Sequence, residues 1–156
     1  MDLTPDELAG VVDLFGSLTR TELVDACGEL AFKRGVDADL DVVETAIDDA
    51  IDSYHLVAID DHEVETDETL LVVGPVAFPA LPDGATDLPH IMEVPSRDLP
   101  RDVVAEAAKS RFREDAVTAV ASGDESRVDS LLDVSYDLEA WEAVEMDGLR
   151  ERLDDI

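Results

Sequence analysis

Two stretches near the N-terminus carry apolar residues at the three- and four-residue spacing of an amphipathic helix. The first follows Thr4 and Pro5 and ends near Gly16, and the second follows Thr19 and ends at Gly35. Each threonine has a glutamate three residues later, which is the capping-box pattern of a helix N-terminus. Glycine is a common stop signal at the other end. The pattern therefore predicts two capped helices.

A third stretch, which begins near Asp41, has the most continuous apolar face of the chain: Val43, Ala46, Ile47, Ala50, Ile51 and Tyr54. Two short apolar runs follow at 56–59 and 70–73, and they predict strands separated by a polar stretch. Three helices followed by a β-hairpin is the order typical of a winged-helix domain. Residues 1–74 are therefore predicted to form a winged-helix-like module.

The pattern changes over residues 75–97, which hold five of the seven prolines. Because proline removes a backbone donor, regular secondary structure is expected to stop there. The segment nevertheless stays too apolar for a free linker, since it contains Val76, Phe78, Leu81, Leu88, Ile91, Met92 and Val94. We expect a proline-rich strap, residues 75–97, that packs along the module.

Helical spacing returns from Pro100 to about Ser122, with the apolar residues Val104, Ala108, Phe112, Ala116 and Val120 in register. Gly123 ends this helix and Asp124 caps the next one. Shorter apolar groups then follow: Val128, Leu131 and Leu132; Leu138, Trp141 and Val144; Leu149 and Leu153. Residues 98–156 are thus predicted to be a helical extension packed on the module, and the whole chain mainly α with a small β-hairpin.

The amino-acid composition adds an expectation about the environment in which the protein works. The 156 residues carry 40 acidic and 11 basic side chains, for a formal net charge of -29. A hydrophobic content of 46% excludes disorder, and the carboxylates run from Asp2 to Asp155 and form no terminal block. The chain contains no Asn or Gln and only two lysines. This composition resembles haloarchaeal proteomes, in which molar potassium screens an acidic surface.

The compartment is expected to be cytoplasmic. The single cysteine, Cys27, cannot form an internal disulfide. Met1 is followed by Asp2, which does not resemble a basic leader, and no apolar run approaches the roughly 20 residues of a membrane span. We therefore expect no membrane association.

The third predicted helix presents a charge that opposes DNA recognition. At about 100° per residue, one stripe opposite its apolar face contains Asp41, Glu44, Asp48 and Asp52. Between positions 35 and 96 the chain has sixteen carboxylates and no Lys or Arg. Because phosphate contacts need cations, nucleic acid is not expected on this helix or the following hairpin. The stripe is either a solvated halophilic face or the docking surface of a basic protein partner.

The cations that exist cluster in one segment, which contains Arg97, Arg101, Lys109, Arg111 and Arg113. Carboxylates lie among them, at Glu106, Glu114 and Asp115. Internal ion pairing is therefore the favoured interpretation. A nucleic-acid or other anion contact is the alternative.

Metal-binding patterns are weak. Asp37, Asp39, Asp41 and Asp48 occupy calcium-loop positions, but Val42 stands where the loop needs glycine, so helix capping is favoured. The only histidines, at 55, 62 and 90, fit no compact zinc pattern. Cys27 lies on the apolar side of its helix and is expected in the core. No phosphate loop or nucleophile motif is present, so we expect neither an enzyme nor a cofactor.

Several segments together resemble a haloarchaeal family of short acidic proteins of unknown function. They are LAGVVDLFG at 8–16, ELAFKRG at 29–35, GPVAFPALP at 74–82, LPHI at 88–91, RFRED at 111–115 and DVSYDLEAW at 133–141. The resemblance covers nearly the whole chain and implies no activity, ligand or catalytic residue. The residues then favour a non-enzymatic interaction or regulatory adaptor that uses the acidic surface. A transcription regulator that contacts nucleic acid through residues 97–113 is the alternative.

Overall fold

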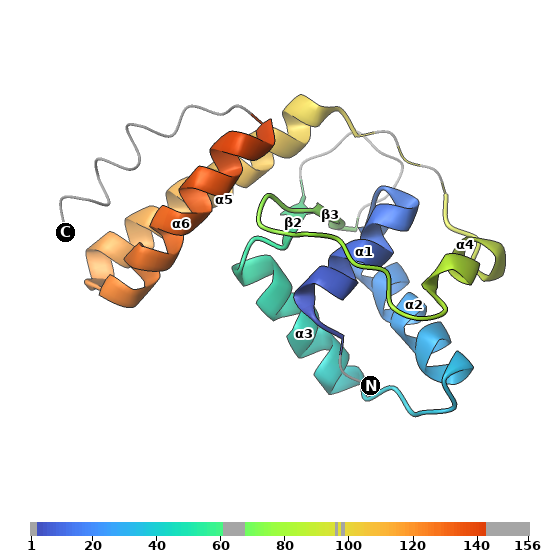
Figure 1. The fold of residues 1–156 in the computed structure, drawn as a ribbon. Helices are drawn as coiled ribbons and strands as arrows, with labels where there is room; N and C mark the ends of the chain where they lie inside the picture. Colours follow the sequence, from blue (N-terminus) through green and yellow to red (C-terminus); the bar gives the residue numbers. More distant parts are fainter. Residues whose placement is uncertain (1–2, 61–67, 96, 98, 143–156) are drawn as a thin grey trace. The chain divides into compact units, whose positions relative to one another are not determined.

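The computed structural model describes residues 3–60, 68–95, 97 and 99–142. The side chains of residues 101, 102, 141 and 142 are not described. The chain divides into two compact units, Met1–Leu99 and Pro100–Ile156. Helices make up most of both units, and a small antiparallel sheet lies in the first (Figure 1). The predicted fold class, mainly α with a small β-hairpin, is confirmed.

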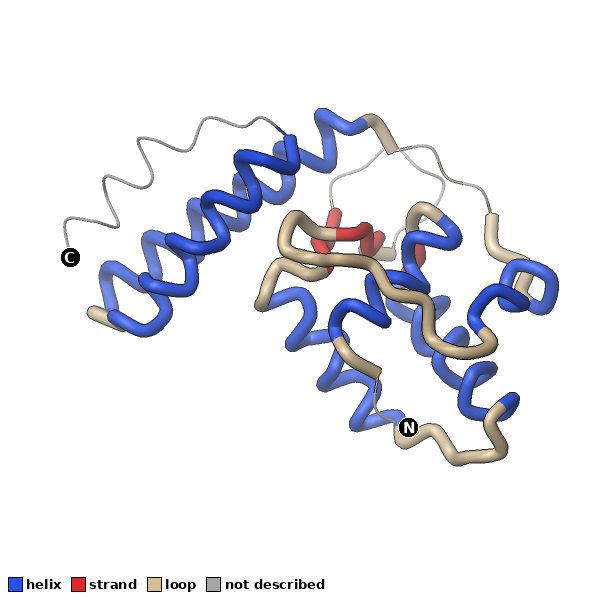
Figure 2. Tube along the Cα trace, viewed as in Figure 1, coloured by secondary structure: helices blue, strands red, loops and turns tan. Residues whose placement is uncertain are grey.

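The first unit alternates helices with short strands, which Figure 2 shows in blue and red. Its elements are α1 (Pro5–Phe15), β1 (Leu18–Thr19), α2 (Arg20–Lys33), α3 (Leu40–Asp52), β2 (Leu56–Ile59) and β3 (Leu70–Val73). The three predicted helices and the two predicted strands are thereby confirmed.

The helix N-termini have the caps that the sequence predicts. The hydroxyl of Thr4 accepts from the amide of Glu7 at 3.1 Å, and the Glu7 carboxylate accepts from the Thr4 amide at 3.1 Å. Thr19 and Glu22 repeat this reciprocal pair at 3.1 and 2.9 Å. Asp39 accepts from two first-turn amides of α3. These side chains satisfy amides that a helix leaves unbonded, so each helix begins where its cap stands.

The sheet has three strands in the order β1-β3-β2, all antiparallel. In the hairpin, Leu56 pairs with Val73. On the other edge of β3, Leu18 pairs with Leu71. The sequence predicts only the hairpin, because the two residues of β1 are too few to show an alternation of apolar and polar positions.

The core of the first unit draws on all three long helices and the sheet. Its fully buried side chains include Leu8, Val11, Val12, Leu18, Leu23, Leu30, Ile47, Leu56 and Leu71. The apolar face of α3 ends in Tyr54, which is 1% exposed and takes a positive φ of 64°. A Cβ on Gly74 would lie 2.2 Å from the carbonyl oxygen of Tyr54, so this close approach requires glycine.

The strap contains helical turns that the sequence did not predict. Residues 85–91 form a 3-10 turn, η1 (Ala85–Asp87), and a short helix, α4 (Leu88–Ile91). The expectation that regular structure stops across the strap is therefore wrong at this point. Pro89 stands in the first turn of α4, where its missing amide breaks no helical hydrogen bond.

Part of the strap packs against the core of the first unit. Ala85 and Leu88 are fully buried in the core. The amide of Ala80 donates to the carbonyl of Asp6 in α1 at 3.0 Å. A Cβ on Gly10 would lie 2.1 Å from the Ala80 carbonyl oxygen, so glycine permits this contact. Other apolar residues that were expected to pack are instead exposed, namely Phe78, Leu81 and Ile91.

The second unit is a helical hairpin of α5 (Arg101–Ser122) and α6 (Glu125–Glu142), which lie side by side (Figure 1). Gly123 turns the chain with a φ of 67°, and Asp124 caps α6. The buried apolar side chains among the described residues are Ala108, Phe112, Ala116, Ala119, Val128, Leu131, Val134 and Leu138. Val120, which was predicted on the apolar face, is 39% exposed. No helix in the described ranges is long and apolar enough to span a membrane.

Candidate interaction surface

The predicted acidic stripe lies on the outer side of α3. Asp41, Asp48 and Asp52 are exposed and Glu44 is half-buried. The residues that alternate with them, Val43, Ile47 and Ala50, are buried. The structure thus brings the four carboxylates to one helix face, as the periodicity predicts.

Arg20, at the start of α2, binds the centre of this stripe. Its guanidinium donates to the Glu44 carboxylate at 2.6 Å, to the Asp48 carboxylate at 2.7 Å and to the Glu44 carbonyl at 3.0 Å. Burial lowers the pKa of Arg20, but the hydrogen bonds to both carboxylates outweigh it and raise that pKa. Sequence reasoning missed this pairing, although Arg20 is the only cation in the first 32 residues. Arg20 therefore offsets part of the negative charge at the centre of the stripe.

The basic segment is largely engaged in ion pairs. Arg97 makes a bidentate contact with Glu22 of α2 at 2.6 and 3.0 Å, and its side chain is 8% exposed. The hydrogen bonds to Glu22 raise the pKa of Arg97. A guanidinium that is buried and bidentate is not presented to a phosphate. Arg97 therefore ties the end of the strap to α2.

The remaining predicted cations lie on α5. Arg111 pairs with Asp115 at 3.1 Å, Arg127 of α6 reaches the same carboxylate at 3.3 Å, and Arg113 lies 3.6 Å from Glu106. Lys109 is half-buried, and the side chain of Arg101 lies outside the described residues. The internal ion pairing that the sequence favours is present at Arg111 and Arg113.

The side chains that the sequence offers for catalysis or metal binding are Cys27 and the histidines. Cys27 is fully buried, and burial raises the pKa of its thiol to about 12. His55 bonds the Ser53 hydroxyl at 2.7 Å, and its ring lies 3.7 Å from Asp6. His62 lies outside the described residues. Among the residues that are described, no group of three or more His, Cys, Asp or Glu could hold a metal ion.

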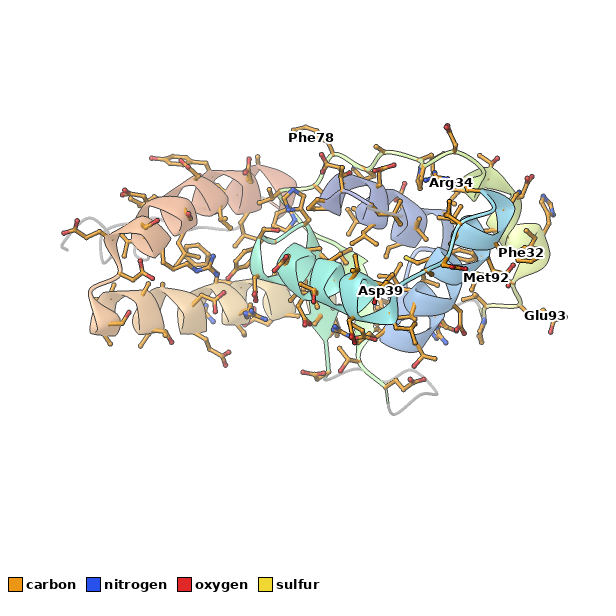
Figure 3. All side chains as sticks on the ribbon, turned by 90° about the horizontal axis from the view of Figure 1, so that it is seen from below. Phe32, Arg34, Asp39, Phe78, Met92 and Glu93 are labelled. Carbon is orange, nitrogen blue, oxygen red and sulfur yellow. The ribbon has the colours of Figure 1, made fainter. Side chains whose placement is uncertain are left out.

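A groove that the sequence did not predict runs along the outer side of α2. It has a volume of about 480 Å³ and is lined by Glu22, Val24, Asp25, Gly28, Glu29, Leu40, Met92, Glu93 and Val94. Close to it, Phe32 is 83% exposed and Leu40 is 62% exposed. Figure 3 shows Phe32, Met92 and Glu93 at the same end of the first unit. The only sequence signal was the position of Phe32, which falls outside the buried register of α2.

Comparison with known proteins identifies the family of the chain, but the function of that family is unknown. The model of a family of unknown function, DUF7109, matches residues 6–156. No curated protein and no solved structure matches the chain significantly. The function must therefore be argued from the surfaces described above.

Proposed function

Because the chain belongs to this family of unknown function, we propose its role from its geometry alone. The protein is a non-enzymatic interaction or regulatory adaptor of the haloarchaeal cytoplasm. Its first unit is a winged-helix-like module that meets a basic region of another protein through the outer face of α3. The observation that carries this proposal is the charge of that face.

The order of elements supports the architectural half of the proposal. A helix, a short strand, two helices and a hairpin follow one another, and the first strand closes the sheet beside β3. In helix-turn-helix proteins of this type, the later helix of the pair enters the DNA major groove. In the proposed module, α3 is the counterpart of that helix, because it follows α2 directly in the chain.

The chemistry of that helix supports the other half. Direct readout and phosphate contacts use Arg, Lys, Asn and Gln, whereas α3 turns carboxylates outward. Arg20, the cation that reaches this face, is held by Glu44 and Asp48. A basic protein segment complements such a surface, and in molar salt the attraction acts only at contact distances of a few ångströms.

Affinity capture from a haloarchaeal lysate kept at molar potassium chloride tests the proposal. Capture from lysate treated with nuclease is compared with capture from untreated lysate. The test variant is Asp41→Lys/Asp52→Lys, which leaves the carboxylates bound to Arg20 intact. Asp129→Lys/Asp133→Lys, on exposed positions of α6, is the charge-matched control.

A specific protein partner that survives nuclease and is lost only with the α3 variant is the expected result. Capture of nothing, or of partners that disappear with nuclease, would contradict the adaptor role. The second outcome would favour the regulator instead.

A further inference from the structure

The groove along α2 combines an apolar base with a negative rim. Val24, Met92 and Val94 are half-buried and supply apolar surface, and Leu40 adds an exposed side chain from the start of α3. Asp25, Glu29 and Glu93 also line it. All of these residues belong to the first unit.

The rim carboxylates differ in what already neutralises them. Glu22 is paired with Arg97 at 2.6 Å. Asp25, Glu29 and Glu93 make no ion pair within the described part of the chain. A ligand that enters the groove therefore meets apolar surface flanked by three carboxylates, and cations on both sides of an apolar stripe would complement it.

Gly28 is the second observation. It lies inside α2, where glycine destabilises a helix relative to alanine, and it lines the groove. A Cβ built on it meets no atom within 4 Å, unlike the Cβ positions of Gly10 and Gly74. The fold itself gives no packing reason for this glycine. Its absent side chain leaves room on the base of the groove for close approach by another molecule.

We propose that this groove binds a short amphipathic helix of a partner protein, with its apolar stripe over Gly28 and flanking Lys or Arg against Asp25, Glu29 and Glu93. This is the helix-in-groove mode of peptide recognition. The proposal rests on the adaptor role but places a second contact on α2, beside the N-terminal end of α3. Phe32 and Leu40 supply exposed apolar contacts for the bound helix.

A displayed library of random peptides of about 16 residues, long enough for about four helical turns, is the probe. It is selected on the full chain in molar potassium chloride, and enriched peptides are titrated against variants. Gly28→Trp places a large side chain in the groove, at a position where a Cβ meets no atom within 4 Å. Asp25→Lys/Glu93→Lys reverses the rim, and Ser130→Trp on the exposed side of α6 is the size-matched control.

Enriched peptides are expected to carry apolar residues at helical spacing flanked by Lys or Arg. Their affinity should fall about tenfold or more on Gly28→Trp and on the reversed rim, and stay unchanged on Ser130→Trp. Circular dichroism and the melting temperature verify that each variant is folded.

The proposal is overturned if no peptide prefers the natural chain to Gly28→Trp, or if the enriched peptides lack cations. It is also overturned if Gly28→Trp changes only self-association, which would assign the groove to a second copy. Its failure is separable from that of the adaptor role. A lysate partner lost with Asp41→Lys/Asp52→Lys but retained by Gly28→Trp removes the groove proposal and leaves the adaptor proposal standing.

Discussion

Single glycines in this chain have opposite physical roles, although the sequence presents them alike. Gly10 lets α1 approach the strap, with its Cβ position 2.1 Å from the Ala80 carbonyl oxygen. A Cβ on Gly28 of α2, in contrast, would meet no atom within 4 Å. The sequence places both on predicted helices but cannot tell them apart, because the neighbour of Gly10 lies 70 residues away.

Gly28→Ala is expected to raise the free energy of unfolding by about 1 kcal/mol, since alanine is the better helix former and nothing opposes its methyl group. Gly10→Ala should lower that free energy by about 1 to 3 kcal/mol, because its methyl group meets backbone. Urea unfolding in molar potassium chloride measures both. Equal signs for the two variants would refute this assignment.

The Glu22–Arg97 pair predicts a pH dependence. Burial raises the pKa of Glu22, but hydrogen bonds from Arg97 and Thr19 outweigh it and hold that pKa below its ordinary 4.5. A carboxylate with a lowered folded-state pKa stabilises fully above 4.5, and this stabilisation is lost as pH falls through the folded-state value. Glu22→Gln keeps the capping bond but not the charge.

At neutral pH, Glu22→Gln should therefore cost about 1 kcal/mol of unfolding free energy relative to the natural chain. The difference should shrink as the pH falls from about 5 towards 3. Denaturant titrations across this range measure it. A difference that stays constant with pH would show that the ion pair contributes nothing.

At the scale of elements, capped and periodic segments were predictable and the others were not. Thr4, Thr19 and Asp39 fix helix starts through local hydrogen bonds, so their signals lie within three residues. β1 is two residues long and exists only because β3 accepts it. α6 continues without a break from the apolar group at Val128 to that at Leu138, and Val134 and Ser135 are buried between the two groups.

The candidate surfaces divide in the same way. The acidic stripe of α3 follows from helical periodicity and was predicted. Its clamp by Arg20 depends on side chains 24 and 28 positions apart in the sequence, and was not. The groove gathers residues from α2, the start of α3 and the strap, so no single window of sequence contains it.

The contribution of the strap to stability can be tested by substituting one buried and one exposed residue of it. Leu88 is fully buried in the core of the first unit, whereas Phe78 is 81% exposed. Leu88→Ala should lower the free energy of unfolding by about 3 kcal/mol, while Phe78→Ala should change it by less than about 0.5 kcal/mol. Thermal or chemical unfolding measures both. A small loss for Leu88→Ala would mean that the strap contributes little to the fold.

For the whole molecule, we expect the net charge of -29 to dominate how stability depends on salt. Most described cations already sit in ion pairs, so the remaining carboxylates repel one another unless salt screens them. The melting temperature should climb steeply between dilute buffer and molar potassium chloride, as the screening length falls to about 3 Å. Differential scanning calorimetry over a salt series measures it. A flat profile would remove the halophilic interpretation.

The thiol of Cys27 is a built-in probe of local opening in such experiments. Because the thiol is buried and its pKa is raised to about 12, an alkylating reagent reaches it only when α2 opens. The alkylation rate of the native chain therefore counts opening events of that helix. Followed by mass spectrometry across a salt series and compared with the free energy of global unfolding, this rate distinguishes local opening of α2 from unfolding of the whole chain.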